Sequence, residues 1–162
     1  MKLKDYSIKH GLEIIHCTGL SAKNLFTNLN IDDYALSHAE ADTALFTIYY
    51  KLRENVWAGT VVIDAEDTDI YVQAAYVSQH VSGELLIKNK NIYVDSQTLF
   101  NNEMADVIIQ LHVMTGCDHN CGFYGHGKRA VIEKVSNTPE ARALLSECGN
   151  NLPIPIQVLS NL

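Results

Sequence analysis

The amino-acid sequence predicts a single α/β domain with a mainly parallel sheet and a helical C-terminal part. Short β-branched runs alternate with longer stretches in which apolar residues recur every three or four positions, a pattern typical of strands connected by helices. The chain of 162 residues is long enough for one domain with a hydrophobic core and too short for two. We expect a core domain over residues 37–150, an N-terminal segment of residues 1–36 and a tail of residues 151–162.

The N-terminal segment predicts little regular structure. Residues 1–9 are polar, so we expect them to be loose or to lie at an edge. Residues 12–17 predict a short strand, because they contain two adjacent isoleucines. Residues 18–33 are rich in Asn and Asp and predict a loop, with a short helical turn at residues 21–29.

A helix is predicted over residues 38–55. Ser37 is a suitable N-cap, and Glu40 at the third helical position completes a capping box, which is also the alternative explanation for Glu40. Asp42 follows in or near the first turn. The apolar residues that we expect on one face of this helix are Ala41, Leu45, Ile48 and Leu52.

The centre of the chain is a strand at residues 60–63 that ends in a cluster of acids, and a helix is expected at residues 68–80. Acids this close repel one another, and a hard cation such as Mg²⁺ or Mn²⁺ would hold them together. The alternative is a solvated acidic turn in which Asp67 is a helix N-cap. The acids are Asp64, Glu66, Asp67 and Asp69.

The next predicted elements are a hairpin and a longer helix. Residues 84–88 and 92–95 flank a turn, and a short helix capped by Asp95 or Ser96 should follow. Residues 104–115 predict one helix that ends at Gly116. The apolar stripe of this helix includes His112, which we interpret as a packed core histidine rather than a ligand.

Two further helices are predicted near the C-terminus, at residues 128–135 and 139–148, the second opened by Pro139. Cys117 and Cys121, with two histidines nearby, raise the alternative of a zinc site. Their spacing is a poor zinc signature, because no second cysteine pair accompanies them.

Charge limits how the chain can contact nucleic acid. The formal net charge is −7, from 12 Lys and Arg against 19 Asp and Glu, which opposes binding through bulk charge. A nucleic-acid partner would need a local basic patch or metal ions that bridge to phosphate. We expect no membrane span and no signal peptide, because no apolar block of sufficient length occurs, and therefore an intracellular protein of the nucleus or cytoplasm.

Three acidic motifs and a glycine turn occur in an order that resembles the PIN-like and flap-endonuclease (5'–3' exonuclease) superfamily, over about residues 37–135. The similarity is greatest to a group of eukaryotic PIN-like proteins, many of them seen near mobile-element genes. The motifs are H-A-E-A-D-T with Glu40 and Asp42, E-D-T-D with Asp67 and Asp69, G-C-D with Asp118, and Gly125-His126-Gly127-Lys128.

The resemblance implies a three-layer PIN-like domain that hydrolyses phosphodiester bonds of nucleic acid, DNA rather than RNA, with Mg²⁺ or Mn²⁺. The five acids of these motifs would be the catalytic metal ligands. Two divalent ions would lower the pKa of the attacking water and stabilise the leaving oxygen. A helix–turn–helix element would hold backbone phosphates through Gly125, Gly127, Lys128 and Arg129.

Two departures from the superfamily pattern matter. The superfamily has a further aspartate on its first strand, for which residues 12–17 offer no counterpart, so we expect the chain to be truncated at its N-terminus. His126 stands where the group often has a basic residue. The alternative function is therefore a catalytically inactive PIN-like fragment that acts as a nucleic-acid or protein interaction module.

Overall fold

The computed structural model describes residues 3–11, 14–18, 21–25, 27, 41–54, 59–117, 121–122, 125 and 127–149. The chain divides into two compact units, Met1–Trp57 and Ala58–Leu162. The described residues form seven α-helices, a two-stranded sheet and a three-stranded mixed sheet. The predicted α/β class is confirmed at this level.

The first unit contains more regular structure than its composition suggests. Helix α1 (Leu3–His10) replaces the loose segment predicted there. Strand β1 (Ile15–Thr18) confirms the predicted short strand within about one residue at its C-terminal end. It pairs antiparallel with β2 (Ser21–Asn24), where a loop with a helical turn was predicted. That prediction is wrong because pairing with β1 satisfies the backbone of polar residues that alone favour a turn.

Helix α2 (Ala41–Glu54) is the fourth element of the first unit. Its buried residues are Phe46 and Tyr49, whereas Leu45 of the predicted stripe is exposed. The predicted apolar face is therefore wrong. Large aromatic side chains bury more apolar area than the aliphatic residues beside them, and they take the buried face. The predicted capping residues lie outside the described residues.

The sheet of the second unit has the order β3-β4-β5. Strand β3 (Val61–Asp64) is parallel to β4 (Leu85–Asn89), and helix α3 (Thr68–His80) forms the crossover between them. Strand β5 (Ile92–Asp95) pairs antiparallel with β4 through a tight turn in which Lys90 has φ 56°. Within the described residues this sheet is mixed, which corrects the predicted mainly parallel sheet.

Short helices follow the hairpin. The 3₁₀-helix η2 (Ser96–Thr98) is capped by the Asp95 side chain, as predicted. The helix predicted over residues 104–115 is instead two helices, α4 (Asn102–Ala105) and α5 (Ile108–Thr115). The Asn101 side chain caps α4 by accepting a hydrogen bond from the Met104 amide, so this helix begins two residues earlier than predicted. The turn between α4 and α5 buries Val107. Gly116 ends α5 with φ 103°, as predicted.

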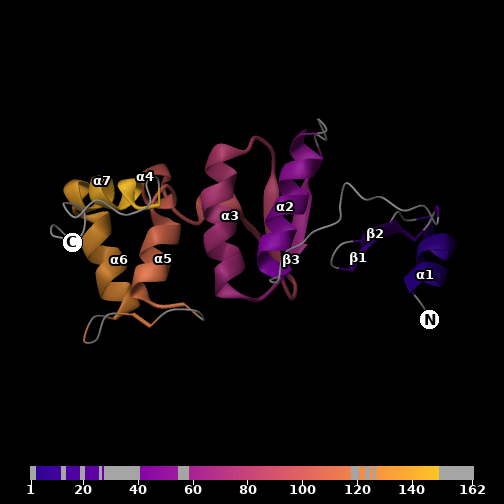
Figure 1. The fold of residues 1–162 in the computed structure, drawn as a ribbon, viewed down its shortest axis with the longest axis horizontal. Helices are drawn as coiled ribbons and strands as arrows, with labels where there is room; N and C mark the ends of the chain where they lie inside the picture. Colours follow the sequence, from indigo (N-terminus) through magenta and orange to yellow (C-terminus); the bar gives the residue numbers. More distant parts are fainter. Residues whose placement is uncertain are drawn as a thin grey trace. The chain divides into compact units, whose positions relative to one another are not determined.

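Helices α6 (Lys128–Ser136) and α7 (Pro139–Glu147) complete the second unit within one residue of their predicted ends. Figure 1 shows α5 and α6 side by side, and a common core joins them to α3, α4 and α7. This core fixes the ends of α3, α5 and α6 relative to one another. Its buried members are Val72, Ala75, Met104, Val107, Ile108, Leu111, Val135 and Leu145.

None of the described helices combines the length and apolar character that crossing a membrane requires.

Candidate metal centre

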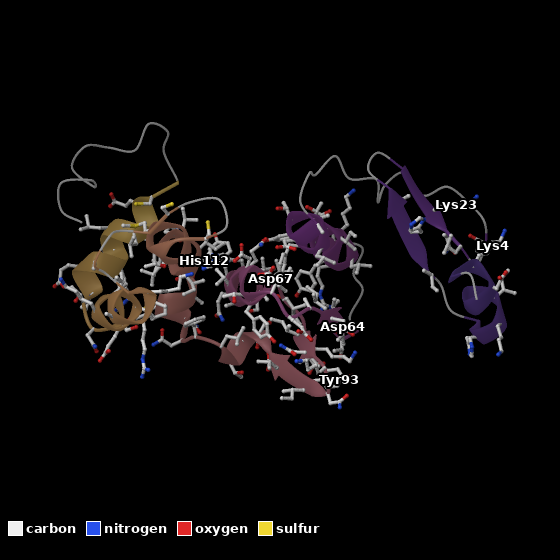
Figure 2. All side chains as sticks on the ribbon, turned by 90° about the horizontal axis from the view of Figure 1, so that it is seen from below. Lys4, Lys23, Asp64, Asp67, Tyr93 and His112 are labelled. Carbon is white, nitrogen blue, oxygen red and sulfur yellow. The ribbon has the colours of Figure 1, made fainter. Side chains whose placement is uncertain are left out.

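The four acids that follow β3 separate into two pairs. Asp64 forms an ion pair with Lys88, which lies directly opposite it in the β3–β4 register, and Glu66 Oε1 lies 3.9 Å from Lys90 Nζ. The hydrogen bond and charge of Asp64 raise the pKa of Lys88. In Figure 2, Asp64 lies toward Tyr93, on the hairpin side of the unit. Lysines of the hairpin therefore balance two of the four charges, and no cation is needed for them.

Asp67 and Asp69 form the second pair, at the start of α3. Asp67 is the N-cap of this helix, and its Oδ1 accepts a hydrogen bond of 3.0 Å from the Asp69 amide. The sequence alternative of a helix cap is thus confirmed for Asp67. A carboxylate oxygen of Asp67 and one of Asp69 lie within 4.8 Å of each other. Two oxygens on opposite sides of one divalent ion lie about 4 to 5 Å apart, so this pair fits a shared ion.

Asp69 is connected to the start of α6 through a histidine. His112 Nε2 lies 2.9 Å from Asp69 Oδ1, and Lys128 Nζ lies 3.2 Å from His112 Nδ1. The His112 side chain is only 10% exposed and that of Asp69 is 27% exposed. The acidic motif after β3 and the lysine of the glycine turn are therefore linked side chain to side chain (Figure 2 shows His112 near Asp67).

His112 is the functional candidate that the sequence interpretation missed. It is largely buried, as predicted for a core histidine, but both ring nitrogens have polar partners. One signal was available in the sequence: a histidine among apolar residues of a buried helix must find hydrogen-bond partners. Which partners it finds depends on α3 and α6, whose positions the sequence pattern does not give.

The glycine turn that precedes α6 leaves backbone open to the surroundings. Gly127 is the N-cap of α6, and no side chain caps that end of the helix. Gly125 has φ 81°, which favours glycine. Among the described residues other than its chain neighbours, no atom lies within 4 Å of a Cβ placed on either glycine. Lys128 is half-buried against His112, whereas Arg129 is exposed.

The segment between α5 and this turn contacts the end of α5 at Gly122. A Cβ on Gly122 would lie 2.3 Å from the Thr115 carbonyl oxygen, which is closer than real Cβ atoms approach. Only glycine fits there without a backbone shift. This contact places Gly122 against the C-terminal end of α5, the helix that carries His112.

The remaining predicted ligands stay predictions. Glu40 and Asp118 lie outside the described residues. Asp42 is half-buried in the first turn of α2, as expected, and belongs to the first unit, whereas Asp67 and Asp69 belong to the second. Cys117 and Cys121 are free thiols, and the two histidines of the zinc alternative lie outside the described residues.

No protein-family model, curated protein or solved structure matches the chain. Membership in the PIN-like superfamily therefore remains a prediction from the motifs. The second unit has two neighbouring carboxylates, one of them held by the largely buried His112, and a glycine turn with basic residues.

Proposed function

We propose that this chain is a divalent-metal-dependent nuclease that hydrolyses phosphodiester bonds, with DNA as the preferred substrate. One observation carries the proposal: the hydrogen-bonded series Asp69, His112, Lys128 joins the acidic end of β3 to the start of α6. Metal-dependent cleavage needs a cation held by oxygens and a nearby group that binds the phosphate backbone, and these two segments supply both.

Asp67 and Asp69 would hold Mg²⁺ or Mn²⁺ through carboxylate oxygens, the ligands that such hard cations prefer. A bound cation would lower the pKa of a water molecule and stabilise the departing oxygen. The motif resemblance adds Glu40, Asp42 and Asp118 to the proposed ligands. Asp64 and Glu66 have lysine partners on the hairpin and are not part of the proposal.

The start of α6 would hold the phosphate backbone of the substrate. Its first amides have no side-chain cap, and the helix dipole favours an anion at this end. Arg129 is exposed and adds a positive charge, while Gly125 and Gly127 leave room for a phosphate to approach. These contacts recognise phosphate without reading base sequence, so we expect structure-dependent rather than sequence-specific cleavage.

The direct test is cleavage of labelled flap and single-stranded DNA by the purified chain with Mn²⁺. Asp69→Asn should reduce the cleavage rate by about 100-fold or more, because it removes the charge of a metal ligand. Loss of a group that only holds a ligand in place typically lowers metal affinity or activity 10- to 100-fold. Glu66→Gln is the matched control, since Glu66 lies three residues away and pairs with Lys90. Cleavage that is equal in Asp69→Asn and the parent chain would refute the assigned site.

The second candidate is a catalytically inactive module that binds nucleic acid or protein. It is favoured by the net charge of −7 and by the engagement of Lys128 with His112, which leaves that lysine fewer donors for a phosphate. This candidate predicts that Mn²⁺ stimulates no cleavage of any DNA or RNA tested and that calorimetry detects only weak divalent binding.

A further inference from the structure

We infer that His112 is a positioning residue that couples the cation site at Asp67 and Asp69 to the phosphate-binding start of α6. This inference deepens the proposed function and rests on it. It goes beyond the five acids and the glycine turn, because His112 belongs to neither group. The geometry that carries it is the pair of contacts on opposite sides of one buried imidazole ring.

The direction of each hydrogen bond follows from the donors available. An ammonium group can only donate, so Lys128 Nζ donates to His112 Nδ1 across 3.2 Å. A neutral imidazole carries its hydrogen on the other nitrogen, so Nε2 donates to Asp69 Oδ1 across 2.9 Å. Lys128, which can only donate, and the Asp69 carboxylate, which can only accept, thus favour the same tautomer of His112.

The hydrogen bond from His112 orients Asp69 for a cation. It occupies Oδ1, so the cation is left the second oxygen of the same carboxylate. Groups that hold a metal ligand in this way typically change metal affinity or activity 10- to 100-fold when they are removed. The ring itself has little freedom, because it is 10% exposed and Leu111, its neighbour on α5, lies in the core.

A phosphate at the start of α6 would share Lys128 with His112. The Lys128 side chain has three donors, and one of them already serves Nδ1. The lysine can therefore contact a phosphate oxygen while it still holds the histidine. In that arrangement Lys128 contacts both the phosphate and His112. A substitution of Lys128 would therefore alter how His112 holds Asp69, although the two side chains lie on opposite sides of the ring.

The first test reads the tautomer directly in the full chain without metal. A long-range ¹H–¹⁵N correlation spectrum of ¹⁵N-labelled protein separates the two imidazole tautomers by their nitrogen shifts. We expect His112 to carry its hydrogen on Nε2 in the parent chain and in Arg129→Met, and to become a mixture when Lys128→Met is combined with Asp69→Asn, because the double variant removes both partners that favour this tautomer. A hydrogen on Nδ1 in the parent chain would overturn the inference, whatever the nuclease assay shows.

The second test measures Mn²⁺ affinity by calorimetry. His112→Phe keeps the ring volume and removes both hydrogen bonds, so we expect a 10- to 100-fold weaker affinity. In His112→Gln the amide can still donate to Asp69, and the affinity should stay within about threefold of the parent. Lys128→Met should weaken Mn²⁺ binding. The double variant of Lys128→Met and His112→Phe should bind no more weakly than His112→Phe alone, because both substitutions interrupt the same series of hydrogen bonds.

The outcomes separate this inference from the function on which it rests. Equal Mn²⁺ affinity in the parent chain and His112→Phe overturns the positioning role and leaves the proposed nuclease intact. Absence of Mn²⁺ binding in the parent chain overturns the proposed function, and the coupling with it. Circular dichroism identifies a variant that has failed to fold. If His112→Phe fails to fold, the Mn²⁺ affinity of His112→Gln is compared with that of Asp69→Asn instead.

Discussion

Asp67 is a helix cap and a proposed cation ligand. The two roles can be tested separately, because a helix cap needs a hydrogen-bond acceptor and a cation needs negative charge. Asp67→Ala should lose both, with a free energy of unfolding lower by about 1 kcal/mol. Asp67→Asn can still accept from the Asp69 amide, so its stability should match the parent within a few tenths of a kcal/mol. Both variants should lose Mn²⁺ binding in calorimetry. Tight Mn²⁺ binding by Asp67→Asn would show that Asp67 is a helix cap and not a cation ligand.

Lys88 offers a pH-dependent test of how the acids are divided. The hydrogen bond and charge of Asp64 raise the pKa of Lys88 in the folded chain. The pair therefore stabilises the fold fully below the unfolded pKa of lysine, about 10.4, and this contribution is lost as pH rises through the higher folded value. NMR titration of the Lys88 side chain should show its pKa falling toward the ordinary value in Asp64→Asn. An unchanged pKa would mean that Asp64 is not its partner.

At the residue scale, local chemistry was readable from the sequence and tertiary contacts were not. The cap at Asp67, the cap at Asp95 and the C-cap at Gly116 depend on neighbouring residues alone, and all three were predicted. The partners of His112 come from helices 43 and 16 residues away in the chain, at Asp69 and Lys128. No periodicity in the sequence encodes those contacts.

At the element scale, α5 is a helix whose buried face contributes to the common core. Leu111 is 1% exposed within that core, whereas Val113 two positions away is 44% exposed. Leu111→Ala should lower the free energy of unfolding by about 2 to 5 kcal/mol. Val113→Ala is the control and should change it by less than about 0.5 kcal/mol, as most surface substitutions do. Chemical denaturation measures both, and equal effects would contradict the described packing of α5.

The elements that were predicted well have strong local signals. Helix α3 has its predicted ends, and the β4–β5 hairpin lies where the Asn-Lys-Asn turn placed it. The division between α4 and α5 was missed, because the cap at Asn101 competes with a helical pattern that continues through it. The predicted hairpin implied the antiparallel β4–β5 pair, whereas the sheet as a whole was expected to be mainly parallel and is mixed in the described residues.

At the scale of the whole molecule, the chain has a net charge of −7, and a divalent ion would reduce repulsion around the acidic site. The alternation of strand and helix patterns predicted the α/β class, and the sequence predicted a cluster of four acids after β3. The structure adds that these four acids do not form one group: hairpin lysines balance Asp64 and Glu66, and the largely buried His112 holds Asp69. Of the four acids that follow β3, only Asp67 and Asp69 therefore remain candidate cation ligands.

The most direct measurement of this central claim is paramagnetic broadening by Mn²⁺ in an amide NMR spectrum of the full chain. Substoichiometric Mn²⁺ should first broaden the signals of residues 67–70 and of His112, and Asp69→Asn should abolish that selectivity. Signals of the hairpin around Lys88 and Tyr93 should broaden later. Broadening that begins at the Asp64–Lys88 side, or that is uniform over all acidic segments, would contradict a cation site at Asp67 and Asp69.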